Sequence, residues 1–284
     1  MIYPRRSQDV EDVGRHYDAL DEFYREVWGD HVHHGLWLSG DESNDVAVRN
    51  LVSYATRHTT LPPGTTVCDV GCGYGAVANL LAGEHGAVVT GLTVSERQYD
   101  YALREYGSPQ CEFLLRDWMR NELDDSSFDV VLAIESLSHM PDKSRFFSET
   151  FRVLRPGGTL VVAAWLAGPS VGRLQRRHLL QAICSDGRLP SMANAGEARE
   201  MARTAGFDEI VVENVTGRVR RTWWICQRRL VARILTDRRY QRYLLDAASS
   251  DRKFLLTIFR ILAAYRTGAM QYGLFSFAKP PASS

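Results

Sequence analysis

The sequence predicts a doubly wound α/β fold, in which a seven-stranded, mostly parallel sheet carries helices on both faces and helical lid insertions. Between residues 66 and 165, short apolar runs alternate with longer amphipathic segments, a pattern typical of parallel β–α–β units. A glycine-rich loop, Gly71–Gly75, follows the first apolar run. The chain has 284 residues, of which 45% are hydrophobic and 24% charged, an ordinary composition for a globular protein with a full core.

Helices precede the expected sheet. Residues 7–28 carry apolar side chains at helical spacing and predict one or two amphipathic helices. A loop rich in His and Gly follows. A further helix is expected from about residue 44 to residue 58, before Leu61–Gly64, whose prolines and glycine break helices. Residues 1–60 are therefore interpreted as an N-terminal helical cap.

Residues 61–167 are interpreted as the core of the fold. Strands are expected at five apolar runs, namely Thr66–Val70, Ala87–Leu92, Cys111–Arg116, Phe128–Ile134 and Thr159–Trp165. The intervening amphipathic segments predict helices at Ala76–His85, Glu96–Tyr106 and Lys143–Leu154, the last closed by a turn at Arg155–Gly158.

The alternation stops after residue 167. Residues 168–194 are expected to be a lid insertion, and residues 195–284 are expected to complete the core. The pieces of this C-terminal part are, in order, a helix at 195–205, a strand at 209–215, a helical lid insertion at about 218–265 and a strand at 271–278.

Charge is balanced overall but uneven along the chain. The formal net charge is zero, whereas residues 218–260 contain twelve Lys or Arg and three Asp. Solvated helix faces are the usual reason for such a run, and a patch for an anionic substrate or partner is the alternative. No nucleic-acid-binding motif accompanies the charge, so we expect no nucleic-acid partner.

The composition also bears on location. No apolar run approaches the roughly 20 residues that a membrane span needs, and the N-terminal residues lack the apolar segment of a secretory signal. The five cysteines have no regular spacing, which favours a reducing compartment over a disulfide framework. Cys68 and Cys72 lie close together, but no second pair of Cys or His residues has the spacing of a zinc site. We therefore expect a cytoplasmic protein with no membrane span and no metal.

The glycine loop is the strongest chemical signal. Asp69 stands two residues before Gly71, and Gly73 and Gly75 follow. Glycines allow tight turns and a close approach of a ligand to the backbone, and the next helix begins with unpaired N–H groups. Nicotinamide and flavin proteins use similar loops, so an oxidoreductase is an alternative at this point.

Four segments in order resemble the class I S-adenosylmethionine-dependent methyltransferases: Asp69–Gly75, Gly91–Gln98, Arg116–Trp118 and Leu154–Gly158. The resemblance implies S-adenosyl-L-methionine as cofactor and a cofactor-binding role for the core. The second segment lacks the usual acidic residue and resembles the tocopherol, sterol and cyclopropane fatty acid branch. The cofactor residues that the resemblance implies are Asp69, Gly71, Gly73, Gly75, Thr93, Gln98, Asp117, Trp118, Ile134 and His34.

These residues have expected partners on the cofactor. In the resembling branch, the segment of Thr93 and the side chain of Gln98 hold the ribose. Asp117 is expected to accept a hydrogen bond from the adenine amino group, and the backbone of Trp118 to donate to a ring nitrogen. A plain helix cap is the alternative role for Thr93 and for Asp117.

The acceptor side resembles tocopherol-type methyltransferases in three stretches, Tyr17–Gly35, Ile134–Lys143 and Tyr265–Pro280. The catalytic candidates are His139, whose neutral imidazole could take a proton, and Glu135, which could face the cofactor or take a proton. A structural role for His139 stays open. Of the histidines at 31–34, His33 or His34 is expected to close the site. The substrate-binding candidates are Tyr17, Tyr24, Trp28, His33, Ser138 and Trp223.

Aromatic residues in the cap and lid point to the acceptor. Their faces attract a sulfonium or a developing carbocation, with about 0.5–2 kcal/mol for each contact. We therefore expect C-methylation of a prenyl or terpenoid alkene on a small apolar acceptor in bacterial specialised metabolism, as in teleocidin-type enzymes, with cyclisation of the cation as a further step. The aromatic residues expected at the pocket are Tyr17, Phe23, Tyr24, Trp28, Trp37, Trp165, Trp223, Trp224, Tyr265 and Tyr272.

Alternatives remain at this level. The acceptor atom is alternatively an aromatic ring carbon or an alkaloid nitrogen, and the non-enzyme alternative is an inactive, cofactor-binding partner subunit. A prenyl diphosphate acceptor would use one of two arginine clusters. A homo-oligomer is also expected, since an N-terminal helix that covers a site is suited to subunit exchange. The first arginine cluster that a prenyl diphosphate could use is Arg173, Arg176 and Arg177, and the second is Arg218, Arg220 and Arg221.

Overall fold

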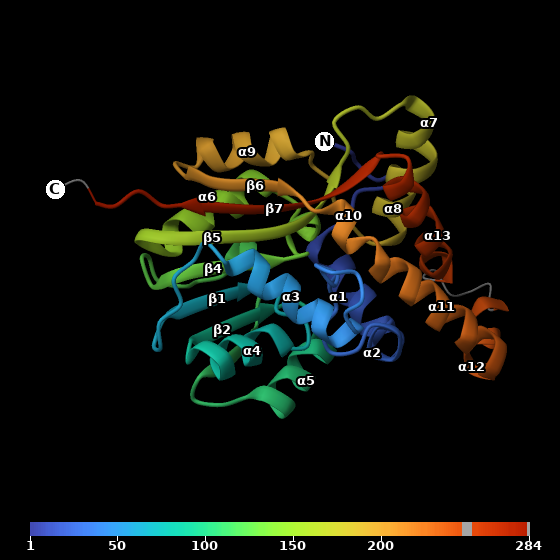
Figure 1. Cartoon of the computed structure of the whole chain (residues 1–284), viewed down its shortest axis with the longest axis horizontal. Coiled ribbons are helices and arrows are strands. Elements are labelled where there is room, and N and C mark those ends of the chain that lie inside the picture. The colour runs from blue at the N-terminus through green and yellow to red at the C-terminus, as the bar shows by residue number, and fades with distance from the viewer. Residues whose placement is uncertain (246–251, 283–284) are drawn as a thin grey trace.

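The computed structural model describes residues 1–245 and 252–282. Within these residues, one sheet of seven strands runs in the order β3-β2-β1-β4-β5-β7-β6 (Figure 1). β7 is antiparallel to both of its neighbours, and the other pairings are parallel. The strands are β1 (Thr66–Val70), β2 (Val88–Thr93), β3 (Cys111–Leu115), β4 (Phe128–Ile134), β5 (Leu154–Ala167), β6 (Asp208–Asn214) and β7 (Met270–Ala278).

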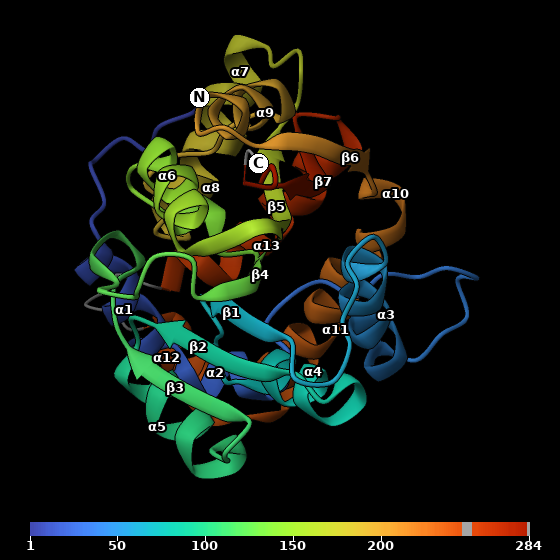
Figure 2. The same ribbon diagram turned by 90° about the vertical axis from the view of Figure 1, so that its left-hand side faces the viewer.

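Helices cover both faces of the sheet, as the sequence predicts. α6 and α9 lie on one side, and α3 and α4 lie on the other (Figure 2). The helices before the lid are α1 (Val10–Ala19), α2 (Asp21–Val27), α3 (Asn44–Thr56), α4 (Ala76–His85), α5 (Glu96–Tyr106) and α6 (Lys143–Val153), with short turns η1 (Trp118–Arg120) and η2 (Leu137–His139). The later ones are α7 (Arg173–Gln175), η3 (Arg176–Leu180), α8 (Gln181–Asp186), α9 (Ala195–Thr204), α10 (Thr216–Val219), α11 (Arg221–Thr236), α12 (Arg238–Leu245) and α13 (Arg252–Arg266).

The central strands β1 and β4 are buried along almost their whole length and are mostly apolar, because both of their faces are covered. Alternate residues of β1 therefore enter different cores: Val67 packs in the cluster beneath α3 and α4, whereas Cys68 and Val70 pack in the cluster beneath α6 and α9. β6, at the edge of the sheet, has no fully buried residue. This burial pattern explains why β1 and β4 are readable from the sequence as short apolar runs.

One predicted turn is wrong. The segment Arg155–Gly158 lies inside β5, which begins at Leu154. It forms an irregularity in the strand, because the pairing of β4 with β5 shifts between Phe128 and Val130. Gly157 has φ +81° there, a conformation that glycine adopts without strain.

The N-terminal helices and the lid meet at one end of the sheet (Figure 1). The strand order reverses between β1 and β4, and ligands of doubly wound proteins bind beyond the carboxyl ends of the strands at such a switch point. Gly14 of α1 allows close packing there, since a Cβ atom at this position would lie 2.6 Å from the Val94 carbonyl oxygen. Among the described residues, no helix has the length and apolar composition needed to cross a membrane.

Candidate active site

A cleft of about 740 Å³ lies over the carboxyl ends of β1, β2 and β4. Its floor is the glycine loop, which is held against β2 by hydrogen bonds from the N–H groups of Gly71 and Cys72 to the Leu92 carbonyl oxygen. Gly71 has φ +77°, and a Cβ atom there would lie 2.5 Å from the Ser136 side chain. The predicted residues that line this cleft are Tyr17, Gly71, Gly73, Thr93, Gln98, Asp117, Trp118, Ile134, Glu135 and His139.

Asp69 lies beside the glycine loop, in a small extension of the cleft. Its side chain is only 2% exposed, and Oδ2 has no hydrogen-bond partner among the described residues. Burial raises the pKa of this carboxyl group to about 7. A buried carboxylate without a partner is unfavourable unless a cation or donor meets it. The site therefore fits a ligand with an ammonium group, such as the amino acid end of S-adenosylmethionine.

The turn after β2 presents two polar side chains. The Thr93 hydroxyl donates to Gln98 Oε1 over 2.8 Å, so the amide NH₂ of Gln98 is the end that remains for a ligand. Ser95 caps α5 by accepting a hydrogen bond from the Gln98 N–H. The Ser95 hydroxyl in turn donates to Asp18 of α1 over 2.6 Å. A helix cap was the alternative role of Thr93, and in the structure Ser95 makes that cap. The Ser95–Asp18 hydrogen bond also joins α1 to the turn after β2.

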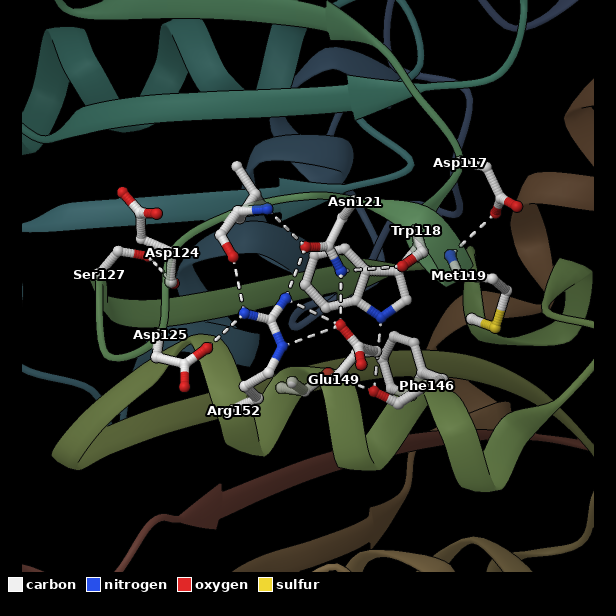
Figure 3. A network of polar contacts seen from close by, with 12 residues as sticks. Asp117, Trp118, Met119, Asn121, Asp124, Asp125, Ser127, Phe146, Glu149 and Arg152 are labelled. Atoms are coloured by element: carbon white, nitrogen blue, oxygen red, sulfur yellow. Dashed lines mark hydrogen bonds and ion pairs between the residues drawn. The ribbon is translucent and has the colours of Figure 1, made fainter.

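The loop after β3 holds Asp117 and Trp118 at the far end of the cleft. The Asp117 carboxylate accepts from the Met119 N–H over 2.9 Å, which is the predicted alternative of a helix cap. Arg152 of α6 fixes this loop from below by donating to the side chain of Asn121. Asn121 then donates to the Trp118 carbonyl oxygen (Figure 3).

A second cavity, of about 490 Å³, adjoins the first. Its walls are mainly aromatic. Five of the six predicted substrate residues line it, and they come from the N-terminal helices, η2 and α11: Tyr17, Tyr24, Trp28, Ser138 and Trp223. Glu135, His139 and Tyr17 line both cavities, so they stand where a cofactor and an acceptor would meet.

His139 has a defined hydrogen-bonding arrangement. Its Nδ1 lies 3.3 Å from the Arg188 carbonyl oxygen, and a carbonyl oxygen only accepts, so Nδ1 carries the proton. Nε2 lies 3.0 Å from the Tyr17 hydroxyl and accepts from it. Burial and the nearby His16 lower the pKa of His139 to about 4. At neutral pH the imidazole is therefore uncharged, with its acceptor nitrogen toward the two cavities.

Glu135 is held on all sides. Oε1 accepts from the backbone N–H and Nδ1 of His34, at 2.6 and 2.8 Å, and from the Tyr272 hydroxyl. Oε2 accepts from Trp165 Nε1 over 2.8 Å. Burial by itself would raise the pKa of Glu135, but His34 and these hydrogen bonds lower it to about 2. This carboxylate keeps its negative charge, and both of its oxygens already accept hydrogen bonds from fixed donors.

The backbone at Glu135 is unusual as well. Its φ is +60°, a left-handed conformation that side chains other than Gly, Asn and Asp rarely adopt. The strand β4 ends immediately before it, so this turn directs the carboxylate toward His34 and Trp165. Local strain at a junction of two cavities is typical of a functional site.

The histidine loop holds two of the predicted site residues. His33, predicted to bind the substrate, lines the extension of the cofactor cleft beside Asp69. His34, predicted to bind the cofactor, is 1% exposed and lines neither cavity. Its Nε2 accepts from Trp223 Nε1 over 2.6 Å. The two side chains have different partners: His33 Nε2 lies 3.2 Å from His31 Nδ1, whereas His34 contacts Glu135 and Trp223.

Gly75 is the predicted cofactor residue at the end of the glycine loop. It caps α4 with φ +84° and lines neither cavity. A Cβ atom at this position would lie 2.8 Å from the Phe113 ring. Gly75 thus permits the turn and the packing of α4 on β3, and it does not reach the cleft.

Several expected pocket residues lie elsewhere. Trp224 is 55% exposed, and Arg221 lies over the Trp37 ring at the start of α3. Arg218 donates to the Tyr54 hydroxyl on the same side of the molecule. The cluster of Arg218, Arg220 and Arg221 therefore lies apart from both cavities, and part of the basic run, residues 246–251, is outside the described residues.

Other lining residues escaped the sequence reasoning. Val10 and Val13 of α1 line the cleft over β1, β2 and β4, called the cofactor cleft below. Leu189, after α8, lines the second cavity, called the acceptor cavity below. They are ordinary apolar residues, and no local signal separates them from core positions. Trp165, by contrast, is among the aromatic residues that the sequence places at the pocket, and it lines the second cavity.

Comparison with known proteins gives consistent matches. A family model described as a methyltransferase domain matches residues 68–162. The chain is 29% identical to 27-O-demethylrifamycin SV methyltransferase of Amycolatopsis mediterranei over 273 residues, which are 95% of this chain and 97% of that protein. It is 32% identical to O-methyltransferase resE of Aspergillus sclerotiorum over 218 residues, which are 74% of this chain and 80% of that protein.

A solved structure extends the match to the whole fold. The crystal structure of the [4+2]-cyclase SpnF superposes with a TM-score of 0.83 and 27% sequence identity, covering 99% of this chain and 100% of that one. The cap and the lid are therefore shared with that protein, and are not additions peculiar to this chain.

Proposed function

The chain belongs to the S-adenosylmethionine-dependent methyltransferases of the class I fold, and on that premise we propose that it methylates a prenyl or terpenoid double bond of a small apolar acceptor in specialised metabolism. The observation that carries this proposal is the second cavity, which joins aromatic walls to a buried, ionised carboxylate, Glu135. Aromatic faces and a fixed negative charge both stabilise the cation that forms when an alkene attacks a methyl group.

When bound, S-adenosyl-L-methionine would supply a methyl group on a positively charged sulfur. A nucleophile in line with the carbon–sulfur bond would bond to the methyl carbon and displace the sulfur. We assign the Asp69 carboxylate to its ammonium group, because Oδ2 has no other partner among the described residues. We assign Thr93 and Gln98 to the ribose hydroxyls, and Asp117 with the Trp118 backbone to the adenine; all four residues line the cleft. Tight positioning of this kind supplies much of the rate enhancement in a displacement reaction.

His139 is assigned the role of proton acceptor. After methylation of an alkene, the carbocation becomes a neutral product when a base takes a proton from a neighbouring carbon. His139 lines both cavities and is unprotonated at neutral pH, and its Nε2 accepts from the Tyr17 hydroxyl. A proton from the acceptor would therefore pass to the Tyr17 oxygen while the Tyr17 proton moves to Nε2. α1 covers the cleft with Val10, Val13 and Tyr17, and this cover would exclude water that could capture the cation.

A hydroxyl oxygen is the second candidate for the methylated atom. A hydroxyl must lose a proton as it attacks, and the Tyr17–His139 pair could take that proton. Two of the matched proteins carry O-demethyl or O-methyltransferase in their names, which favours this alternative. Ring-carbon and nitrogen methylation would use the same cavity, and the position of the methyl group in the product separates all four cases.

The test uses the methyl-¹³C cofactor with prenylated phenols, prenylated indoles and geraniol, and NMR of the products. A new carbon–methyl bond at the prenyl group is expected. A methyl group found only on oxygen, nitrogen or a ring carbon would reject the alkene proposal. Absence of transfer to every acceptor, with intact binding of S-adenosylhomocysteine, would favour an inactive cofactor-binding protein.

Adjacent tryptophans supply a matched pair for the cavity. Trp223 is 1% exposed and lines the acceptor cavity, whereas Trp224 is 55% exposed. Trp223→Phe is expected to slow methyl transfer by about tenfold with unchanged affinity for S-adenosylhomocysteine, and Trp224→Phe is expected to change neither. Equal effects of the two substitutions would argue against this cavity as the acceptor site.

We also propose that the protein forms a homo-oligomer. The support is the placement of α1 and α2 as a separate cover over the cleft, which a second subunit could brace. Light scattering after size-exclusion chromatography tests it, and a mass of one chain at micromolar concentration would reject it.

A further inference from the structure

A further open cleft, of about 1220 Å³ and distinct from the two cavities of the candidate active site, lies between the N-terminal segment and the lid. The N-terminal segment forms one wall, and η3, α8 and α13 form the others; the Arg5 N–H donates to Ser185 of α8 across it. Among the described lining residues of this cleft, Asp186 is the acidic one. The five arginines that line it are Arg5, Arg6, Arg177, Arg188 and Arg260.

The positive charge of the cleft is only partly neutralised within the described chain. Asp186 is already engaged, because Oδ2 accepts from Arg260 and from the Thr257 hydroxyl. Arg5, Arg6 and Arg177 have no ion-pair partner among the described residues. Guanidinium groups facing one cleft repel one another, and a bound anion offsets this repulsion through charge-assisted, often bidentate hydrogen bonds.

Gln8 gives an independent indication. Its side chain lines the cleft and is 8% exposed. The amide oxygen has no hydrogen-bond partner among the described residues, and the amide nitrogen makes one long contact, 3.4 Å from the Arg6 carbonyl oxygen. A buried amide with unused hydrogen-bonding capacity calls for a further partner.

The cleft shares a wall with the acceptor cavity. Asp186 and Arg188 line the cleft, while Gly187 and Leu189, which alternate with them, line the cavity. Arg188 has φ +53°, and its carbonyl oxygen accepts from His139. A ligand held by the arginines would therefore lie directly behind the proposed proton acceptor.

From these observations we propose that the cleft binds a phosphate-class anion, a phosphate or diphosphate group. The group belongs either to the methyl acceptor itself or to a separate small anion. The inference rests on the cleft and not on the identity of the methylated atom, because binding can be measured without methyl transfer.

Calorimetric titration of the full chain with pyrophosphate, saturated with S-adenosylhomocysteine and at constant ionic strength, tests the site. The variant is the double substitution Arg6→Gln with Arg177→Gln. Its control, Arg173→Gln with Arg220→Gln, removes the same charge from exposed arginines outside the cleft. We expect pyrophosphate binding that weakens at least about tenfold in the first double variant and stays within about twofold in the control.

Two results would overturn the proposal. One is no pyrophosphate binding by the unaltered protein at millimolar concentration, and the other is an equal loss in both double variants, which marks a general charge effect. Loss of S-adenosylhomocysteine binding would instead count against the proposed function, so the two failures are distinguishable.

Geranyl diphosphate and geraniol separate the two sources of the anion. If the acceptor carries the group, geranyl diphosphate binds more tightly than pyrophosphate, and the cleft variant weakens it while geraniol binding stays unchanged. If a separate anion occupies the cleft, geraniol and pyrophosphate bind together without competition, and geranyl diphosphate binds no more tightly than pyrophosphate.

Discussion

At the scale of single residues, the site depends on groups whose ionisation the fold has changed. Burial raises the pKa of Asp69 to about 7 and lowers the pKa of His139 to about 4. Both side chains are therefore uncharged between about pH 4 and pH 7. Glu135 differs, since its many donors outweigh burial and keep it ionised. Each shift has a measurable consequence.

Asp69 should release a proton when the cofactor binds. Its pKa is about 7 in the folded protein against 3.8 ordinarily, so folding favours the protonated form, and the contribution of this group to stability falls as pH rises from about 4 to about 7. An ammonium group beside it lowers the pKa again. Calorimetry of S-adenosylhomocysteine binding at pH 6, in buffers of different ionisation enthalpy, should show release of about one proton, and at pH 8 release of only about a tenth of a proton.

Asp69→Asn is the control for this release. The amide cannot titrate, so binding should become weaker and independent of the buffer. A wild-type binding enthalpy that is the same in all buffers at pH 6 would contradict the assignment of Asp69 to the ammonium group.

His139→Ala should reduce methyl transfer by about 10²–10⁴-fold, the usual range for a general base, with little change in S-adenosylhomocysteine affinity. The folded-state pKa of about 4 lies below the ordinary 6.5, so the neutral form is favoured, and the rate should stay level from pH 8 down to about pH 5. Below about pH 5 a proton acceptor should lose rate, with an acid limb near pH 4 that His139→Ala lacks, whereas a loop support predicts no such limb in either protein. An acid limb near pH 6.5, or equal loss of cofactor affinity in the variant, would reject the assignment.

At the scale of elements, the position of α1 decides whether the cofactor cleft is covered. α1 is joined to the turn after β2 by the contact of Gly14 with Val94 and by the Ser95–Asp18 hydrogen bond. The same helix contributes Tyr17 to the acceptor cavity. A displacement of α1 would therefore disturb both ligands at once.

Gly14→Ala should weaken S-adenosylhomocysteine binding by about tenfold, because the added Cβ meets a carbonyl oxygen at 2.6 Å and such overpacking costs about 1–3 kcal/mol. Gly83→Ala in α4 is the matched control, since nothing lies within 4 Å of its Cβ position. Alanine in an exposed helix position should stabilise the protein by up to about 1 kcal/mol. Titration calorimetry and thermal unfolding measure both; unchanged affinity in Gly14→Ala would mean that α1 does not govern the cleft.

At the scale of the whole molecule, the cap, the lid and the sheet enclose two cavities that no single part contains. Binding of S-adenosylhomocysteine should therefore stabilise the cap selectively. At 100 times its dissociation constant, a ligand adds about 2.7 kcal/mol to the free energy of unfolding.

Hydrogen exchange locates that stabilisation. Amides of α1 should exchange more slowly with S-adenosylhomocysteine bound, because Val10, Val13 and Tyr17 line the cofactor cleft. Amides of α9, which packs on α6 and β6 and lines neither cavity, should change less. Protection that is equal in α1 and α9 would indicate global stabilisation without closure of the cap.

The sequence by itself determined the sheet, the order of its strands and helices, the glycine loop and the cofactor. The strands, the helices and the loop follow from local patterns, since apolar runs specify buried strands and the Asp69–Gly75 turn needs glycine at left-handed positions. The cofactor follows from the resemblance of four ordered segments to a known family. The aromatic residues Tyr17, Tyr24 and Trp28, in or beside the two short helices of the cap, were also expected at the acceptor cavity.

Only the tertiary structure decided which polar groups meet. The pairs His34 with Glu135, Tyr17 with His139, and His34 with Trp223 are separated by 101, 122 and 189 residues. No periodicity links positions so far apart, and adjacent residues such as His33 and His34 have different partners. Their roles, and the ionisation of Glu135 and His139, depend on burial and neighbours, which exist only once the cap and lid have packed on the sheet.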